Sequence, residues 1–168
     1  LNELGKLTID DLCKYKGIGE AKAITILAAS ELGKRRKETA PHERIVIRCS
    51  KDIYQHFYPV MCDLAVEECW ALMLNQANKV ISTYQISTGG LNSALVDVRC
   101  LLREVLLRRA TSVAVCHNHP SGNIRPSMDD DRLTERIRKS CQMIDIRFLD
   151  HLVLADGAFY SYADEGKL

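Results

Sequence analysis

The sequence predicts a three-layer α/β domain with a mixed sheet, preceded by a small helical segment. Two observations lead to this prediction. Strand-like and helix-like stretches alternate from residue 44 onward, and two pairs of neighbouring strands read as hairpins. Before residue 44, apolar residues recur at helical spacing. A chain of 168 residues is long enough for one well-packed domain with a small appendage.

The composition is that of a soluble globular protein, with 46% hydrophobic and 27% charged residues. No apolar run approaches the roughly 20 residues that a membrane span requires. No basic-then-apolar leader opens the chain, so we expect a cytoplasmic protein without membrane contact. Because the first residue is Leu1 and not Met, we expect a fragment of a longer protein. The net charge of +1 favours no particular partner.

The seven cysteines are scattered along the chain and include no CxxC pair. An odd number at irregular spacing is a poor disulfide framework and a poor structural zinc set. We therefore expect these residues to be small buried hydrophobes in a reducing cytosol.

Residues 1–37 are expected to form two helices around a glycine turn. The helices are predicted over Ile9–Tyr15 and Glu20–Gly33, with Gly33 as the stop signal, and Gly17-Ile18-Gly19 joins them. The segment carries three more basic than acidic side chains, a modest positive bias. Residues 38–43 are polar and broken by a proline, which is typical of a linker.

Residues 44–168 are expected to form the α/β domain. Its elements, in chain order, are a short strand Ile45–Arg48, a hairpin of Cys69–Leu74 and Val80–Ser87, a helix around Val98–Leu106, a buried strand Val113–Cys116, a charged helix Met128–Met143 and a second hairpin of Leu152–Leu154 and Phe159–Tyr162. The second hairpin turns at Asp156-Gly157, a dipeptide that favours tight turns between strands.

Two histidines and one aspartate form a candidate metal site. His117 and His119 follow the predicted buried strand two residues apart, so in extended chain both imidazoles can reach one point. Asp130 lies in the first turn of the next predicted helix, and the loop between them, rich in proline and glycine, can fold it back. Two imidazoles and one carboxylate are typical of a catalytic zinc site, because the fourth tetrahedral position stays open.

Each of these residues also has an ordinary structural interpretation. A single histidine at a strand end is usually a satisfied polar residue. Ser127 and Asp130 have the Ser-x-x-Asp spacing of a helix cap, in which the serine oxygen accepts from a free backbone N–H. Asp129 and Asp131 compete with Asp130 on spacing alone. The residues by themselves therefore leave the choice of carboxylate open.

The same segment reproduces a known signature. His117-Asn118-His119, seven residues, Ser127, two residues and Asp130 match the JAMM pattern H-x-H-x7-S-x2-D. The sequence HNHPSGNIRPS at residues 117–127, together with residues 87–92, 150–154 and 160–166, resembles the RadC family of JAMM-domain proteins. The resemblance covers roughly Arg44 to Leu168. The resemblance implies a JAB/MPN α-β-α sandwich related to cytidine deaminases. It also implies one zinc ion held by both histidines and Asp130, with Ser127 helping to stabilise an oxyanion.

The resemblance further implies a glutamate that acts as general base at the start of an earlier strand. Family strands have a glutamate, one variable residue and then an apolar run, which places this role on Glu67. Glu68 is the alternative. A carboxylate at this place takes a proton from the attacking water and passes it to the leaving amine.

The glycine turn near the start resembles a helix-hairpin-helix motif. Such hairpins direct backbone N–H groups at a phosphate, here from Gly17 and Gly19, while Lys16 and Lys22 add positive charge. RadC proteins carry such a region ahead of the JAMM domain. We therefore expect weak DNA contact without sequence preference. A plain helical turn is the alternative.

Three functions are compatible with these features. The leading one is a zinc metallopeptidase or isopeptidase-like hydrolase, whose protein or peptide substrate the sequence does not name. A zinc deaminase would need H-x-E followed by P-C-x-x-C, which the chain lacks. The non-enzymatic alternative is a DNA-associated module in recombination or repair, with a structural or vestigial zinc site.

Overall fold

The computed structural model describes residues 3–38, 44–89 and 96–168. The chain divides into two compact units, Leu1–Glu43 and Arg44–Leu168. Of the expected linker 38–43, Glu38 belongs to a helix and the other residues lie outside the described ones. The end of the family-like loop 87–92, from residue 90, also lies outside them.

The first unit is helical, as predicted. Its elements are the 3-10 helix η1 (Leu4–Lys6), α1 (Ile9–Cys13) and α2 (Glu20–Glu38). A capping box begins α1, since Thr8 and Asp11 each bond the other's backbone N–H. Leu12 of α1 and Ala23 of α2 are the buried residues of this small core.

Gly33 does not end the second helix, and the prediction that it would is wrong. α2 continues to Glu38, whereas α1 ends at Cys13, short of the predicted Tyr15. A glycine inside a helix costs only about 1 kcal/mol relative to alanine, and the lysines and arginines that follow are good helix formers. The Arg35 guanidinium also pairs with Glu31 one turn earlier, at 2.8 Å. Although α2 has 19 residues, no helix among the described residues is long and apolar enough to cross a membrane.

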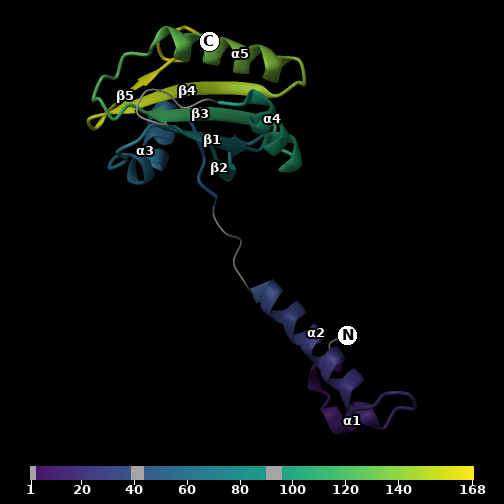
Figure 1. Ribbon diagram of the computed structural model, residues 1–168. Helices are drawn as coiled ribbons and strands as arrows, with labels where there is room; N and C mark the ends of the chain where they lie inside the picture. Colours follow the sequence, from purple (N-terminus) through teal and green to yellow (C-terminus); the bar gives the residue numbers. More distant parts are fainter. Residues whose placement is uncertain (1–2, 39–43, 90–95) are drawn as a thin grey trace. The chain divides into compact units, whose positions relative to one another are not determined.

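The second unit is a five-stranded mixed sheet with helices on both faces (Figure 1). Its elements are α3 (Ser50–Met61), β1 (Glu68–Leu74), β2 (Val80–Thr88), α4 (Val98–Leu107), β3 (Ser112–Asn118), α5 (Met128–Gln142), β4 (Arg147–Ala155) and β5 (Ala158–Ser161). The strand order is β2-β1-β3-β4-β5. Only β3 and β4 are parallel, and the other neighbours are antiparallel. The predicted three-layer α/β class is confirmed.

Strand alternation builds two cores, one on each face of the sheet. On β1, Leu72 and Leu74 join the core beneath α3, whereas Ala71 and Met73 join the core beneath α4 and α5. β3 alternates in the same way, and its residues are fully buried. Figure 1 shows α3 on one face and α5 on the other. A central strand covered on both faces needs the continuous apolar run seen in the sequence.

Two elements of the second unit differ in kind from the prediction, and β4 begins at Arg147, well before the predicted Leu152. Helix α3 was not predicted, although Ile53, Phe57 and Met61 recur every four residues and are buried. Pro59 weakens the helical pattern near its end, because proline removes a backbone donor. The expected strand Ile45–Arg48 is reduced to one bridge, between Val46 and Lys79.

The cysteines are only partly the buried hydrophobes that the sequence suggested. Cys69, Cys116 and Cys141 are buried, but three others are exposed and one is partly exposed: Cys13, Cys49, Cys62 and Cys100. All seven are free thiols in the described residues. The exposed ones lie outside the sheet, in or next to α1 and α3, where no core position constrains them.

Candidate metal centre

Strand pairing brings the candidate site residues together. β1 runs antiparallel to β3, and Cys69 pairs with His117. The start of β1 therefore lies beside the end of β3, which places Glu67 near His119. Asp130 comes from the first turn of α5, which follows the loop after β3. Side chains separated by up to 63 positions thus meet at one end of the sheet.

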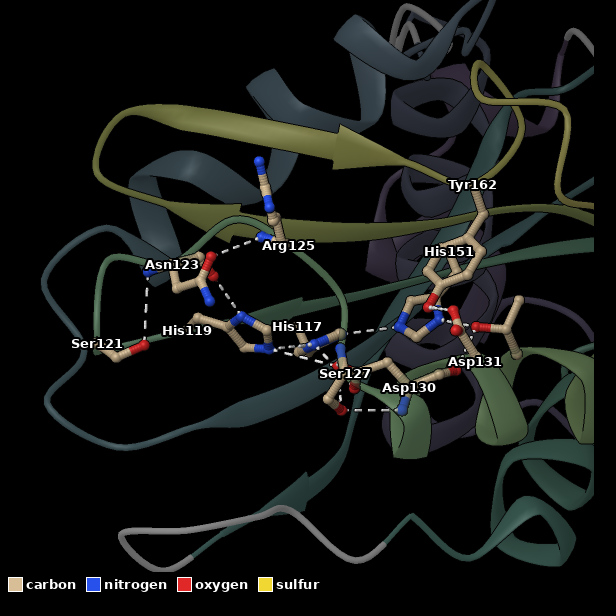
Figure 2. A network of polar contacts seen from close by, with 11 residues as sticks. His117, His119, Ser121, Asn123, Arg125, Ser127, Asp130, Asp131, His151 and Tyr162 are labelled. Carbon is tan, nitrogen blue, oxygen red and sulfur yellow. Dashed lines mark hydrogen bonds and ion pairs between the residues drawn. The ribbon is translucent and has the colours of Figure 1, made fainter.

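Four ligand-type atoms converge here, one each from Glu67, His117, His119 and Asp130, all within 4.8 Å of one another. The Nε2 atoms of the two histidines are 3.0 Å apart, and Asp130 Oδ1 is 3.2 Å from Nε2 of His117 (Figure 2). His117 and Asp130 are buried, whereas Glu67 and His119 are partly exposed. The group is therefore anchored inside the domain and reachable from solvent.

The ring of His119 presents a lone pair to this group. Its Nδ1 lies 2.6 Å from the carbonyl oxygen of Asn123, which can only accept, so Nδ1 carries the proton and donates. In the neutral ring, Nε2 then faces Nε2 of His117 and the Asp130 carboxylate. Acceptors that face acceptors repel each other unless a cation or a proton lies between them. The donor set therefore fits a metal cation.

The pKa values keep most of these groups in metal-binding form. Burial lowers the pKa of His117 to about 4, so its ring is neutral at pH 7. Burial raises the pKa of Asp130, but the hydrogen bond with His119 and the nearby His117 and Ser127 outweigh it and hold the carboxyl well below its usual range. The same hydrogen bond with Asp130 raises the pKa of His119. A proton and a metal ion thus compete for His119.

Ser127 and Asp130 form the capping box that their spacing allowed. The backbone N–H and the hydroxyl of Ser127 both donate to Oδ2 of Asp130, each at 2.7 Å. The Asp130 N–H in turn donates to the Ser127 hydroxyl at 3.2 Å. Capping and metal binding are compatible, because the cap holds Oδ2 while Oδ1 faces His117. The Ser127 proton is directed at Asp130 here, so its oxyanion role stays an expectation.

The two neighbouring aspartates point elsewhere. Asp129 pairs with Arg132 at 3.1 Å on the exposed side of α5. Asp131 accepts the hydroxyl proton of Tyr162 at 2.8 Å. Successive helical residues are about 100° apart around the axis, so only one of three consecutive aspartates faces the histidines. That residue is Asp130.

Glu67 and Glu68 lie on opposite sides of the chain entering β1. Glu68 accepts a hydrogen bond from the Trp70 indole at 2.9 Å, and Trp70 packs with the core beneath α3. Side chains alternate along a strand, so Glu67 points the other way and joins the candidate metal group. The geometry thus favours Glu67 over Glu68 as the carboxylate beside the histidines.

Asn118, the residue between the two histidines, holds the segment that carries Glu67. Its Oδ1 accepts from the backbone N–H of Glu68 at 2.8 Å, and its Nδ2 donates to the carbonyl of Val66 at 3.0 Å. Both peptide groups that flank Glu67 are therefore tied to β3. This buried amide fixes the glutamate backbone relative to the histidines, a role that no pattern in the sequence indicates.

The glycine turn of the first unit lies between α1 and α2. Gly17 has a φ of +89°, a conformation that favours glycine, and the Gly19 carbonyl accepts from Ala23 at the start of α2. Lys22 donates to the Gly17 carbonyl at 2.9 Å, so part of its donor capacity is used within the turn. Lys16 is exposed. Contact with DNA by these residues stays a prediction.

Two further polar residues lie next to the site and were not predicted from the sequence. His151 of β4 is fully buried with its Nε2 2.8 Å from Nδ1 of His117, and Thr134 of α5 lies 2.6 Å from the other ring nitrogen. A signal was present in the sequence, because a histidine inside the apolar run of β4 needs a polar partner. Which partner it finds depends on tertiary packing.

Residues 47–167 match the family model described as the RadC-like JAB domain. The chain belongs to this family. RadC-like relatives are similar over nearly the whole chain. An UPF0758 protein of Flavobacterium johnsoniae is 43% identical over 99% of this chain and 72% of its own length. One of Porphyromonas gingivalis is 39% identical over 100% of this chain and 75% of its own. One of Clostridium acetobutylicum is 38% identical over 100% and 73%.

Proposed function

We propose that this RadC-like chain is a zinc-dependent hydrolase that cleaves an amide bond in a peptide or an isopeptide. The observation that carries the proposal is the donor set itself. Two imidazoles and one carboxylate converge, and a second carboxylate lies within 4.8 Å of them. Three ligands leave one coordination position open, which is typical of catalytic and not structural zinc sites.

The candidate ligands are suited to zinc by chemistry and by support. Nitrogen and carboxylate donors are those that zinc prefers, and each is oriented by a second partner. The Asn123 carbonyl orients His119, and the Ser127 cap orients Asp130. When bound, zinc would supply a Lewis acid that polarises a carbonyl and acidifies water.

Glu67 is the group that we propose to move protons. Its partly exposed carboxylate can accept a proton from the attacking water and deliver it to the departing amine nitrogen. The two hydrogen bonds from Asn118 fix the peptide groups on either side of it, so its reach is defined by the backbone. Glu68 is less suited to this task, because it is absent from the candidate metal group and its carboxylate accepts from the Trp70 indole.

The experiment compares Glu67→Gln with the matched control Glu68→Gln. Hydrolysis of a panel of peptides and isopeptide-linked ubiquitin-like substrates is measured with and without a chelator. We expect Glu67→Gln to lose about 10²- to 10⁴-fold in rate, because an amide cannot accept the proton, while its zinc content stays the same. Glu68→Gln should stay active.

Two results contradict the proposal. If Glu68→Gln is inactive and Glu67→Gln is active, the base is assigned to the wrong residue. If zinc-loaded wild type cleaves nothing in the panel, a DNA-associated module with a non-catalytic metal site becomes the better explanation. The turn at Gly17–Gly19, followed directly by α2, is the structural feature that favours that alternative.

A further inference from the structure

His151 joins the candidate metal centre to the interior of the domain. It pairs with Val115 across the parallel strands β3 and β4, so its ring lies on the same face as His117, two residues further along β3. Its Nε2 is 2.8 Å from Nδ1 of His117, and its Nδ1 is 2.6 Å from Oγ1 of Thr134. Tyr162 stacks on its ring with centroids 5.2 Å apart and an interplanar angle of 9° (Figure 2).

The short contacts determine where the protons lie. Thr134 Oγ1 is 2.6 Å from the carbonyl oxygen of Asp130, which has no proton to give, so the hydroxyl proton lies between these two oxygens. Nδ1 of His151 must therefore be protonated and donate to Oγ1 of Thr134. The Tyr162 hydroxyl donates its proton to Asp131, so it does not donate to Thr134 in place of His151.

The same reasoning continues to the metal ligand. The ring of His151 is fully buried, and the partners of its two nitrogens are a hydroxyl and an imidazole, not a carboxylate, so the ring is in its neutral form. With its single proton on Nδ1, His151 can only accept at Nε2. Nδ1 of His117 must then donate to it, which leaves Nε2 of His117 with a free lone pair toward His119 and Asp130.

We propose that Thr134 and His151 form a hydrogen-bond relay that holds His117 in the Nδ1–H tautomer and so keeps its Nε2 available to the metal. The relay starts at one candidate ligand, His117, and ends on the backbone of another, Asp130. Both are positioning residues, since neither belongs to the ligand group. The inference rests on the metal-binding half of the proposed function and not on the reaction.

A relay of this kind matters because a neutral imidazole has two tautomers. If the proton of His117 moves to Nε2, the ring loses its ligand atom at the centre. In most metal sites a carboxylate or a carbonyl next to the ligand histidine prevents this, because such groups can only accept. Here the partner is another histidine, which can donate or accept. The choice is made one bond further away, by the hydroxyl of Thr134 and the Asp130 carbonyl.

The test replaces Thr134 with valine, which keeps the branched shape and removes the hydroxyl. Without an acceptor at Nδ1, His151 can place its proton on Nε2 and donate to His117, which forces the proton of His117 onto Nε2. Thr134→Ser is the matched control, because it keeps the hydroxyl. The full chain is labelled with ¹⁵N-histidine, and the tautomers are read from long-range ¹H–¹⁵N spectra of the metal-free protein. Zinc affinity is measured separately, by competition with a chelating dye.

We expect Nδ1–H on both His117 and His151 in the wild type and in Thr134→Ser. In Thr134→Val, an Nε2–H form of His117 should appear, and zinc should bind about 10- to 100-fold more weakly. Nε2–H on His151 in the wild-type spectrum overturns the relay, whether or not the valine variant folds. Weaker zinc binding with an unchanged tautomer overturns it too, since packing then explains the loss. A wild type that binds no zinc overturns the proposed function instead, and the metal-free spectrum still decides the relay.

Discussion

Two buried polar groups lie close together in this domain, and they differ in whether their acceptor atoms have hydrogen-bond donors. Asp150 of β4 is surrounded by donors: the N–H groups of His151 and Ala163 donate to Oδ1, and the Ser161 hydroxyl donates to Oδ2 at 2.6 Å. At the candidate metal centre, acceptors face acceptors. The first arrangement is complete without any ligand. The second is suited to a cation, which makes it a candidate binding site.

The largest expected effect comes from removing acceptors at the metal centre. A His117→Ala, His119→Ala double variant should lose its zinc, from about one ion per chain to none, by elemental analysis. Zinc at about 100 times its Kd should stabilise the wild type by about 2.7 kcal/mol and leave the double variant unchanged. Equal zinc in both proteins would show that the ion binds elsewhere.

A smaller effect should follow from removing the acceptor of the complete group. Asp150→Ala removes the acceptor of two buried donors, the His151 N–H and the Ser161 hydroxyl, and of the partly buried Ala163 N–H, so the free energy of unfolding should fall by about 1–3 kcal/mol. Urea denaturation in the presence of a chelator measures this. The control is Asp150→Asn, which keeps one carbonyl oxygen and should lose less. If Asp150→Ala unfolds at the urea concentration of the wild type, the contrast between the two groups is wrong.

The smallest effect concerns the two lysines at the glycine turn of the first unit, Lys16 and Lys22. Lys22 already has a hydrogen-bond partner inside the turn. Binding of the full chain to random duplex DNA should be weak and should fall steeply with salt. Lys16→Ala should weaken binding more than Lys22→Ala, because Lys22 already donates to Gly17. Fluorescence anisotropy at two salt concentrations measures this, with Lys139→Ala in α5 as the control. Without affinity at low salt, the turn is only a packing element.

Local sequence patterns predicted much of the fold. The hairpin of β1 and β2, the buried strand β3 and the charged helix α5 have periodicities that depend on neighbouring residues alone. The misses at α3 and Gly33 have another cause. Pro59 and Gly33 are unfavourable inside helices, but Phe57 packs in the core against the sheet, and Gly33 is followed by good helix formers and flanked by the ion pair of Arg35 with Glu31. A single unfavourable residue therefore did not decide either helix.

The candidate site could be predicted only where it is local. His117, His119, Ser127 and Asp130 lie within one segment, and their spacing matches a known signature. The strand pattern of the family placed the base on Glu67 and left Glu68 as the alternative, and only the pairing of β1 with β3 explains how Glu67 comes to lie beside the histidines. The contact of His151 with His117 needs the parallel pairing of β3 with β4. Spacing in the sequence thus indicates the ligands, while their supporting partners appear only in the folded chain.

The bonds of Asn118 also have a consequence for the order of folding. Glu68 and Asn118 are 50 residues apart in the chain, and their hydrogen bond forms only after the antiparallel pairing of β1 with β3. Contacts of such sequence separation form late, because a long loop must close first. An unfolded chain carries His117 and His119 as neighbours, but it cannot hold the glutamate beside them. The proposed base is therefore in place only once β1 and β3 have paired in their native register, whereas the three candidate ligands all come from β3 or the segment that follows it.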